Sequence, residues 1–379
     1  MLSNTVSKAK RPLCYVSIDS ILEGVGASQI LAYMKQLAPR YNIHLITMEK
    51  KEIDPQFALE ISSLGINWTP LKFGRYGIIG GVLRFVRLFI EIDRNSLVHA
   101  RSDIPALAAA LKNCKNFIWD CRAMMADQRL ALNTKKTNWI EYKILRLVER
   151  IIAAKSSSII TITKSVIPVY LERYNISPDK FTMITTCVDT DMFKKTPQCF
   201  SNQLNILIPG TISPAYDIEL MNLIIEEFRL RREVSVTVAL GSGYTDLWEL
   251  IDYDTVVKKG FVEMPSLIAE SNLGMSIWKE SLGISLKSVA STKTAEFLSV
   301  GRPVFVNFSQ GDLGSLLLNS KVGVSVLARD PESIRKYVDQ MTTILEDEYS
   351  VDSCRKLATD LFSLADGLKV LESLYDSLP

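Results

Sequence analysis

The sequence predicts an α/β fold with two doubly wound, parallel-sheet domains. Two series of short apolar strands alternate with helical patterns of ten or more residues, which is typical of parallel sheets covered on both faces. The chain has 379 residues and is too long for one ordinary core. A short polar connection at 197–202 separates the two series. We therefore expect one domain over 1–196, a second over 203–362, and a binding cleft between them.

The first series begins with a buried strand at 13–18, a loop at 19–28 and a helix at about 29–37. Gly24 and Gly26 lie in this loop, where glycines let a ligand approach the backbone. Two glycines also serve simply to turn the chain, so this signal is weak by itself. We expect the further strands of this series at 43–47, 97–100, 117–120, 158–162 and 182–185, and an amphipathic helix packed against the sheet at 139–154.

Polar side chains gather at the ends of two of these strands. His99 and Arg101 end one strand, and Asp120 and Arg122 end the next. Because ligands in open α/β sheets bind outside the carboxyl ends of the strands, both pairs belong on the binding edge. The alternatives are structural: a strand-end histidine satisfied by a hydrogen bond, and an ion pair between Arg122 and Asp120 or Asp127.

The second series begins with a strand at 204–208, and further strands are expected at 234–240 and 273–278. Gly210 and Thr211 follow its first strand, and small residues at such a turn let the backbone approach a phosphate.

The most informative segment is 285–306, which predicts a loop, a helix over about 292–300 and a strand that begins at Pro303. Ser291 or Thr292 can cap the helix, and Gly301 suits the left-handed position after its last turn. Free N–H groups and the positive end of the helix dipole favour an anion at this N-terminus, and a phosphate is the expected one. The loop before the helix offers Lys287, Ser288 and Ser291 to that anion.

Two charged residues of this helix point to a nucleotide. Lys293 lies in the first turn, where the dipole disfavours a cation, so a negatively charged ligand would explain its position. Glu296 lies one turn deeper and can accept two hydrogen bonds from a diol such as a ribose. The alternative is a solvated surface pair between Lys293 and Glu296.

Composition narrows the classes of partner. Forty-four Lys and Arg residues against 42 Asp and Glu give a formal charge of +2, which argues against a nucleic-acid binder that relies on a broad basic field. The six cysteines form no C-x-x-C pair and the two histidines do not cluster, so we expect reduced thiols and no zinc site. Residues 1–11 are polar and basic without a signal-peptide core, so a cytoplasmic location is expected.

The helical pattern at 76–94 combines a narrow polar stripe of Arg84, Arg87, Glu91 and Arg94 with a very apolar remainder. The charges and a glycine pair break any span of about twenty apolar residues, so this segment is not transmembrane. Burial against the sheet is the preferred interpretation, and docking on a membrane surface is the alternative.

The segment T-K-T-A-E-F-L-S-V-G-R-P-V at 292–304 resembles the donor motif P-T-K-x-x-E-Y-L-A-x-G-x-P-V of retaining GT-B glycosyltransferases of family 4 and their relatives. Ser291 stands where that motif has proline, and Ser288 stands where many members have a second glutamate that contacts the sugar. Relatives commonly carry an arginine and a lysine shortly after Gly210, whereas this chain has Ser-Pro-Ala-Tyr-Asp at 213–217.

Other segments resemble the same superfamily. The glycine pair resembles its acceptor-face loop, and H-A-R-S at 99–102 and D-C-R at 120–122 resemble segments of a bacterial subset. Residues 182–193, with Lys164 and Ser165 before them, resemble the signature that closes the first domain. The resemblance implies catalytic roles for His99, Asp120 and Arg122, acceptor binding by Gly24, Gly26, Ser28 and Arg101, and donor binding by Gly210, Thr211, Gly260, Phe261, Val262, Lys287, Ser288, Ser291, Thr292, Lys293 and Glu296.

The resemblance implies two Rossmann-like domains facing each other across a cleft, with a last helix at 363–379 that crosses back to the first domain. It implies a hexosyltransferase that moves a sugar from a UDP- or GDP-sugar to a glycan or lipid-linked acceptor, with retention, in bacterial surface polysaccharide synthesis. We expect no cofactor and, since no Asp-x-Asp or His/carboxylate cluster lies near the donor motif, no metal. The inner membrane surface is a candidate partner. The alternatives are a nucleotide-sugar epimerase of the same fold and a non-catalytic sugar-binding protein.

Overall fold

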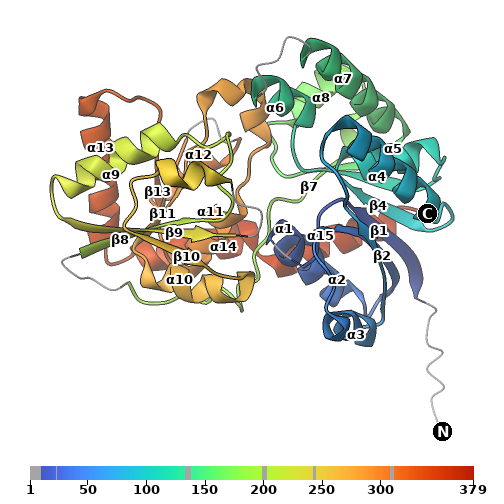
Figure 1. Cartoon of the computed structure of the whole chain (residues 1–379), viewed down its shortest axis with the longest axis horizontal. Helices are drawn as coiled ribbons and strands as arrows, with labels where there is room; N and C mark the ends of the chain where they lie inside the picture. Colours follow the sequence, from blue (N-terminus) through green and yellow to red (C-terminus); the bar gives the residue numbers. More distant parts are fainter. Residues whose placement is uncertain (1–9, 23, 133–137, 199–202, 242–244, 308–310) are drawn as a thin grey trace, which may run out of the picture.

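The structure, a computed structural model, describes residues 10–22, 24–132, 138–198, 203–241, 245–307 and 311–379. It contains two parallel sheets, of seven and six strands, which confirms the predicted fold class (Figure 1). The first sheet lies in the right-hand lobe of Figure 1 and the second in the left-hand lobe.

The first sheet has the strand order β3-β2-β1-β4-β5-β6-β7. The order reverses between β1 and β4, so the loops that follow these two strands open the crevice where ligands of such sheets bind. The strands are β1 (Arg11–Ser17), β2 (Tyr41–Glu49), β3 (Ile66–Lys72), β4 (Leu97–Arg101), β5 (Phe117–Cys121), β6 (Ser158–Thr161) and β7 (Phe181–Met183).

Helices cover both faces of this sheet, and each face has its own apolar core. Three helices cover one face: α2 (Ala32–Leu37), α3 (Pro55–Ser63) and α15 (Leu364–Ser377). The other face is covered by α4 (Gly77–Glu91), α5 (Asp103–Leu111), α7 (Asn138–Lys155) and α8 (Ile167–Tyr174), and α6 (Met125–Leu132) follows β5.

The second sheet has the order β10-β9-β8-β11-β12-β13, so its crevice lies between the loops after β8 and β11. Gly210 follows β8, and the segment 277–291 follows β11. The predicted donor residues at Gly210 and 287–293 therefore meet at the topological switch point. The strands are β8 (Gln203–Pro209), β9 (Glu233–Leu240), β10 (Thr255–Lys258), β11 (Leu273–Ser276), β12 (Val304–Val306) and β13 (Gly323–Ser325).

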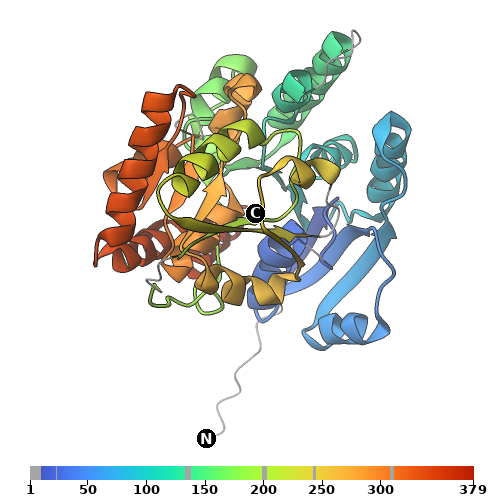
Figure 2. The same cartoon turned by 60° about the vertical axis from the view of Figure 1, so that its left-hand side comes forward.

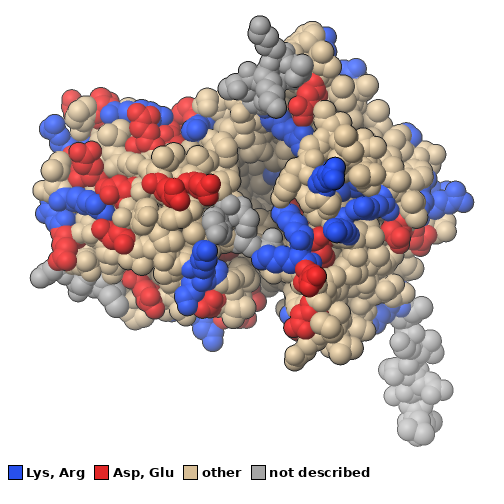
Figure 3. Space-filling model, in the orientation of Figure 1, with Lys and Arg blue, Asp and Glu red and all other residues tan. Residues whose placement is uncertain are grey.

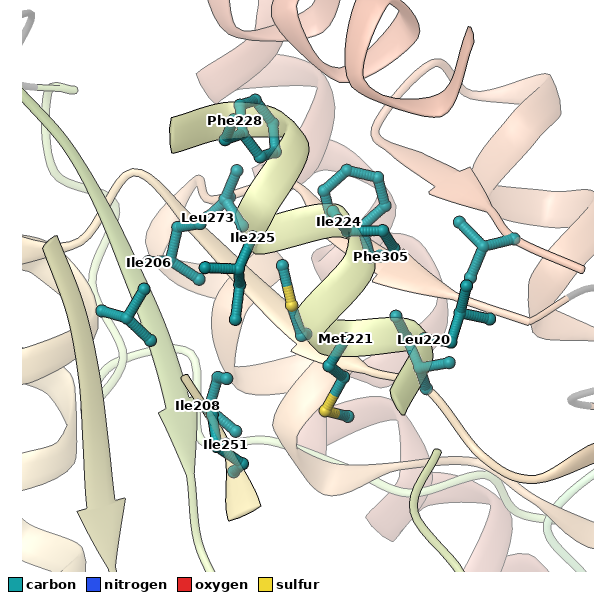
Figure 4. Packing of buried hydrophobic residues seen from close by; sticks show 14 of the residues in the cluster. Ile206, Ile208, Leu220, Met221, Ile224, Ile225, Phe228, Ile251, Leu273 and Phe305 are labelled. Carbon is teal, nitrogen blue, oxygen red and sulfur yellow. The ribbon is translucent and has the colours of Figure 1, made fainter. Parts of the chain in front are cut away.

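The helix after β8, α9 (Ile218–Arg229), shows how the second domain forms its core. Leu220, Ile224 and Phe228 recur every four residues and lie on one side of the helix, packed over the strands (Figure 4). With α9 on this face are the short helix η3 (Asp246–Leu250) and α13 (Pro331–Glu346). The opposite face is covered by α10 (Met264–Glu270), α11 (Thr292–Val300), α12 (Leu313–Asn319) and α14 (Ser350–Phe362), with the 3₁₀ segments η4 (Phe261–Glu263) and η5 (Glu280–Ser288) nearby.

The chain crosses between the two domains twice, and the crossings meet. The Val188 N–H donates to the Phe362 carbonyl at 2.7 Å, and the Leu364 N–H donates to the Val188 carbonyl at 3.1 Å. From this point α15 lies against the first domain, where Leu371 and Tyr375 join the core shared with α2.

Arg302, which follows the α11 motif, fastens the connection between the domains. Its guanidinium is fully buried and donates to the carbonyl oxygens of Thr196 and Pro197 at 3.0 and 2.9 Å. It also donates to the carbonyl oxygens of Ala269 and Ser271, each at 2.7 Å. Arg302 is therefore a structural residue of this segment.

The loop predicted at 19–28 is helical from Gly24 onward, so that prediction is wrong. Helix α1 (Gly24–Gly26) leads through a π-helical turn, η1 (Ala27–Leu31), into α2. A Cβ added to Gly26 would lie 1.8 Å from the Ser20 carbonyl oxygen, so this glycine lets the helix start pass against the preceding turn. The glycine pair thus has a packing function that the sequence pattern does not reveal.

Three strands were not predicted from the sequence, namely β3, β10 and β13. All three lie at sheet edges. An edge strand has one neighbour and is partly exposed, so it lacks the continuous apolar run that marks a central strand. Pro70 within β3 further weakens the strand pattern, because proline in a sheet is confined to edges.

Helix α4 packs against the core of the first sheet through Leu88, Phe85 and Phe89, but a second apolar side faces solvent. The preferred interpretation of burial therefore holds for only one side of the helix. Ile78 and Ile79 are 77% and 76% exposed. Arg84 is buried instead, because its guanidinium donates to the Arg75 carbonyl at 2.7 Å and lies 4.3 Å from the Phe73 ring centre. In Figure 2 the helix stands at the outer edge of the first domain.

Helix α7 also exposes apolar side chains to solvent, over the first half of its length. The expectation that 139–154 packs against the sheet holds at Ile152 and Ala153, which are buried. The first half of α7 instead exposes Trp139, Ile140, Ile144 and Leu147.

Candidate functional site

Asp120 is the centre of a buried polar cluster at the crevice of the first sheet. It ends β5 directly beside Arg101 of β4, so both side chains reach the same edge. His99 Nε2 lies 3.2 Å from Asp120 Oδ2, and Arg101 Nη1 lies 3.4 Å from the same oxygen. Arg122 Nε lies 2.7 Å from Oδ1 and 2.9 Å from Oδ2. The structure therefore brings together four of the predicted residues.

The electrostatics of this cluster hold Asp120 ionised. Burial would raise the pKa of the carboxyl group, but Arg122, the hydrogen bond with His99 and Arg101 together hold the pKa below its usual range. Burial lowers the pKa of His99, although Asp120 opposes that shift. The cluster is thus a carboxylate surrounded by two guanidinium groups and a neutral imidazole.

His99 is fixed from three sides. Its Nδ1 lies 2.8 Å from the Tyr375 hydroxyl of α15, and its ring stacks on Tyr15 at 4.3 Å. The sequence analysis did not assign Tyr375 to this cluster. A signal was present, because Leu364, Leu371 and Tyr375 share one face of the last helix.

Arg122 is the member of the cluster with an exposed surface. Its side chain retains 17% of its exposure, whereas Asp120 and Arg101 are almost fully enclosed. Arg101 also donates to Asp19 in the loop after β1, at 3.1 Å. Asp120 is therefore placed to orient Arg122, and Arg122 is placed to meet a ligand.

The other predicted acceptor residues lie in the first helical turns after β1. Gly24 is exposed and has a positive φ of 54°, whereas Gly26 is buried against the Ser20 backbone. The Ser28 hydroxyl donates back to the Gly24 and Val25 carbonyl oxygens, each at 3.3 Å. Gly24 therefore leaves the backbone approachable, while Gly26 serves packing.

Helix α11 has the predicted bounds of 292–300. Ser291 is its N-cap residue, but its side chain makes no capping hydrogen bond, and Gly301 takes the left-handed conformation after the last turn. The first N–H groups of α11 therefore lack a side-chain cap of the usual kind, which leaves them to a ligand.

Lys293 reaches from the first turn of α11 to the glycine turn after β8. A Cβ added to Gly210 would lie 2.6 Å from Lys293 Cε and 2.8 Å from its Nζ, and the φ of +93° at this residue also favours glycine. The ammonium group donates to the Tyr216 hydroxyl at 2.7 Å. The structure thus joins Gly210 and Lys293 in one site, as the phosphate prediction requires.

Glu296 is buried, with 8% of its surface exposed. Burial raises the pKa of its carboxyl group to about 8, and Lys293 only partly opposes this shift. Within the part of the chain that the structure describes, this carboxyl group has no hydrogen-bond partner. Neither carboxyl oxygen is fully enclosed, so hydroxyl donors of a ligand can reach this group.

The loop before α11 is held by the first domain. The Ser288 hydroxyl accepts from the Met124 N–H at 3.0 Å and donates to the Ser285 carbonyl at 2.8 Å. The Lys287 carbonyl accepts from the hydroxyl groups of Thr163 and Ser165 at 2.5 and 3.1 Å. Ser288 therefore links the donor loop to the segment that carries Arg122, two residues before Met124.

The remaining predicted donor segment surrounds η4. The Gly260 N–H donates to Glu263 Oε2 at 3.0 Å, and Phe261 packs against Phe193 with ring centres 5.7 Å apart. Val262 is exposed and Thr211 follows Gly210 after β8. Within the six described segments, no group of three His, Cys, Asp or Glu side chains could hold a metal ion.

The two crevices face a hollow between the lobes, visible in the centre of Figure 3. Of the helices in the described segments, none is both long enough and apolar enough to span a bilayer.

No protein-family model and no curated protein matches the chain by sequence. Solved structures do match its fold. Sucrose-phosphate synthase from Thermosynechococcus elongatus has a TM-score of 0.73 at 12% identity, over 97% of this chain and 98% of that one. Anabaena Alr3699/HepE, in complex with UDP and glucose, has a TM-score of 0.67 at 12% identity, over 97% and 100% of the chains.

A third neighbour is described as a UDP-N-acetylglucosamine 2-epimerase from Listeria monocytogenes. It has a TM-score of 0.60 at 11% identity and covers 97% of this chain and 96% of that one. At such identities the likeness establishes the fold alone. With two parallel-sheet domains and glycosyltransferases among its structural neighbours, the chain has the GT-B fold.

Proposed function

We propose that this protein is a glycosyltransferase that moves a hexosyl group from a nucleotide diphosphate-sugar to a glycan or lipid-linked acceptor. One observation carries the proposal. Glu296 is a buried carboxyl group without a hydrogen-bond partner in the described segments, one turn from Lys293 at a helix N-terminus. A phosphate fits the helix end and Lys293, and a ribose diol fits Glu296.

The proposed donor site includes Gly210 and Thr211 at the β8 turn, with Lys287 and the 291–293 helix start opposite. The base would lie against Gly260, Phe261 and Val262. One structural neighbour, Anabaena Alr3699/HepE, is found in complexes with UDP and with UDP-glucose, which makes UDP the first nucleotide to test. We propose family 4 membership and retention on the sequence motif alone, with no divalent metal and no cofactor.

We propose that Arg122 contacts the reacting sugar or the acceptor, while Asp120 and His99 position it. The carboxylate of Asp120 is already surrounded by donors, so it is a poor general base in this arrangement. Arg101, Gly24, Gly26 and Ser28 would form the acceptor side of the cleft. The domain limits proposed for this division are 1–196, 203–362 and 363–379.

Epimerase activity is the alternative function, because one structural neighbour with the same fold is described as an epimerase. An epimerase needs acid and base groups near the sugar, yet both histidines lie in the first domain. Product analysis with a labelled donor separates the two activities, because only a transferase moves the label to an acceptor. Turnover of any donor would dismiss a mere sugar-binding protein.

A thermal-shift screen with UDP, GDP and their sugars tests the donor proposal, because a ligand that binds only the folded state raises its apparent stability. At a ligand concentration of about 100 Kd the expected gain is roughly 2.7 kcal/mol. A gain with one nucleotide and its sugar supports the proposal, and no shift with any of them counts against it.

We propose further that α4 docks on the inner membrane surface from the cytoplasmic side. Its exposed side carries six aliphatic residues, a contiguous apolar face of the kind that marks an interaction site. Lys72, Arg75, Arg87 and Arg94 lie in or beside the helix and favour anionic lipid. The aliphatic residues are Ile78, Ile79, Val82, Leu83, Val86 and Ile90.

A further inference from the structure

Tyr216 lies in the segment Ser-Pro-Ala-Tyr-Asp at 213–217, shortly after the Gly210 turn. Its ring is 5% exposed and stacks on Trp278 with centres 4.9 Å apart and planes 27° from parallel. An isolated antiparallel β-bridge joins the same two residues. Trp278 is itself held by Asn307, which accepts from the Trp278 N–H at 2.6 Å. Tyr216 therefore occupies a rigid position.

This position brings the Tyr216 hydroxyl to Lys293. The Lys293 ammonium donates to the hydroxyl at 2.7 Å, so the tyrosine holds it by a hydrogen bond at the end of the side chain. On its other side the lysine passes directly over Gly210, where an added Cβ would lie 2.8 Å from its Nζ. Lysine has three rotatable N–H donors on a flexible stem, so its placement depends on such contacts.

We infer that Tyr216 is a positioning residue that fixes Lys293 over the Gly210 turn, ready for the phosphate of a nucleoside diphosphate. The inference rests on the proposed function. Lys293 is thereby an ordered cation beside the N-terminus of α11. Fixing that lysine before the ligand arrives reduces the entropy lost on binding.

A double-mutant cycle tests the inference by calorimetry with UDP and GDP and their nucleosides. Tyr216→Phe removes only the hydroxyl, and Lys293→Met removes the charge while keeping the chain over Gly210. We expect Lys293→Met to weaken diphosphate binding about ten- to a hundredfold and Tyr216→Phe about three- to tenfold. Nucleoside affinity should change less than about twofold in either variant.

The combined variant is decisive because a residue that acts through Lys293 has no effect without it. Tyr216→Phe should therefore cost nothing further in the Lys293→Met background. Tyr253→Phe is the matched control, since Tyr253 also packs against a tryptophan of this domain, Trp248. It should bind like the wild type.

The outcomes separate this inference from the proposed function. If neither nucleotide binds, or if Lys293→Met leaves affinity unchanged, the proposed donor site fails and the inference with it. If Lys293→Met weakens binding but Tyr216→Phe equals the wild type or binds more tightly, only the inference is overturned. Equal losses from Tyr216→Phe in both backgrounds would also overturn it.

Discussion

The two domains each bury a carboxyl group near their crevice, and they treat it in opposite ways. Asp120 in the first domain has Arg101, Arg122 and His99 around it, and its pKa is lowered. Glu296 in the second domain has no hydrogen-bond partner in the described segments, and burial raises its pKa to about 8.

The two carboxyl groups therefore differ in whether the protein itself supplies their hydrogen-bond donors. A buried charge that is fully paired rigidifies its surroundings, and removing one partner is expensive. A buried carboxyl group without donors is unfavourable until a ligand supplies them. The first domain therefore presents a preorganised arginine, and the second presents a carboxyl group that can bond to hydroxyl groups.

The largest effect should come from breaking the paired carboxylate. Asp120→Asn leaves the buried guanidinium of Arg101 and the partly exposed one of Arg122 beside a neutral amide, and should reduce the free energy of unfolding by about 3–5 kcal/mol. Asp252→Asn is the control, because Asp252 pairs with Arg229 at 3.0 Å on the surface and should cost under about 1 kcal/mol. Urea unfolding compares them, and similar losses would refute the contrast.

Removing the charge of Glu296 should instead increase the free energy of unfolding relative to the wild type, and this gain should appear only at higher pH. The folded-state pKa of Glu296 is raised from 4.5 to about 8, so the folded protein binds a proton that the unfolded chain releases. That contribution to stability is complete below pH 4.5 and is lost as the pH rises to about 8.

Glu296→Gln lacks this titration, so it should gain on the wild type as the pH rises. At about 1.36 kcal/mol per pH unit, the gain between pH 5.5 and 7.5 is about 2–3 kcal/mol. Urea unfolding at the two pH values measures it. A difference between variant and wild type that stays constant with pH would show that Glu296 is already paired.

A smaller effect is expected from the outer helices, where the domains also differ. Helix α9 buries its apolar side whereas α4 exposes one of its two apolar sides. Ile79→Glu should weaken binding to liposomes with anionic lipid about tenfold, since it removes an exposed aliphatic group that would enter the bilayer surface and adds a negative charge. Flotation at low salt measures this. Leu59→Glu on α3 is the control, because Leu59 is equally exposed on the other face of the sheet.

Equal flotation of the two variants would place the contact elsewhere, and a wild-type protein that stays soluble would dismiss membrane docking. In either case the exposed apolar side chains of α4 would not be explained by membrane binding.

The central strands and α11 could be predicted because each carries a local signal, a continuous apolar run in the strands and the terminating Gly301 in α11. The edge strands β3, β10 and β13 could not be predicted, since β3 and β10 are exposed or half-buried along most of their length and β13 has only three residues. The direction of α4 was hidden for a different reason. A helical pattern fixes which residues share a face, but only the contacts of Arg84 decide which face turns inward.

The candidate site shows the same limit. Lys293 and Glu296 stand out locally, whereas the contact of Lys293 with Tyr216 spans 77 positions. The bond from Ser288 to Met124 spans 164 positions and joins the two domains, so no local pattern could indicate it.

The most direct test of the central claim is to measure how α11 binds a nucleotide. Calorimetry on folded Lys293→Ala and Glu296→Ala proteins would use UDP, GDP and their nucleosides. Losing a charge-assisted contact costs about 1.5–3 kcal/mol, roughly ten- to a hundredfold in affinity. We predict that Lys293→Ala weakens diphosphate binding more than nucleoside binding, and that Glu296→Ala weakens both. Unchanged affinities in both variants would contradict the assignment of α11 as the donor site.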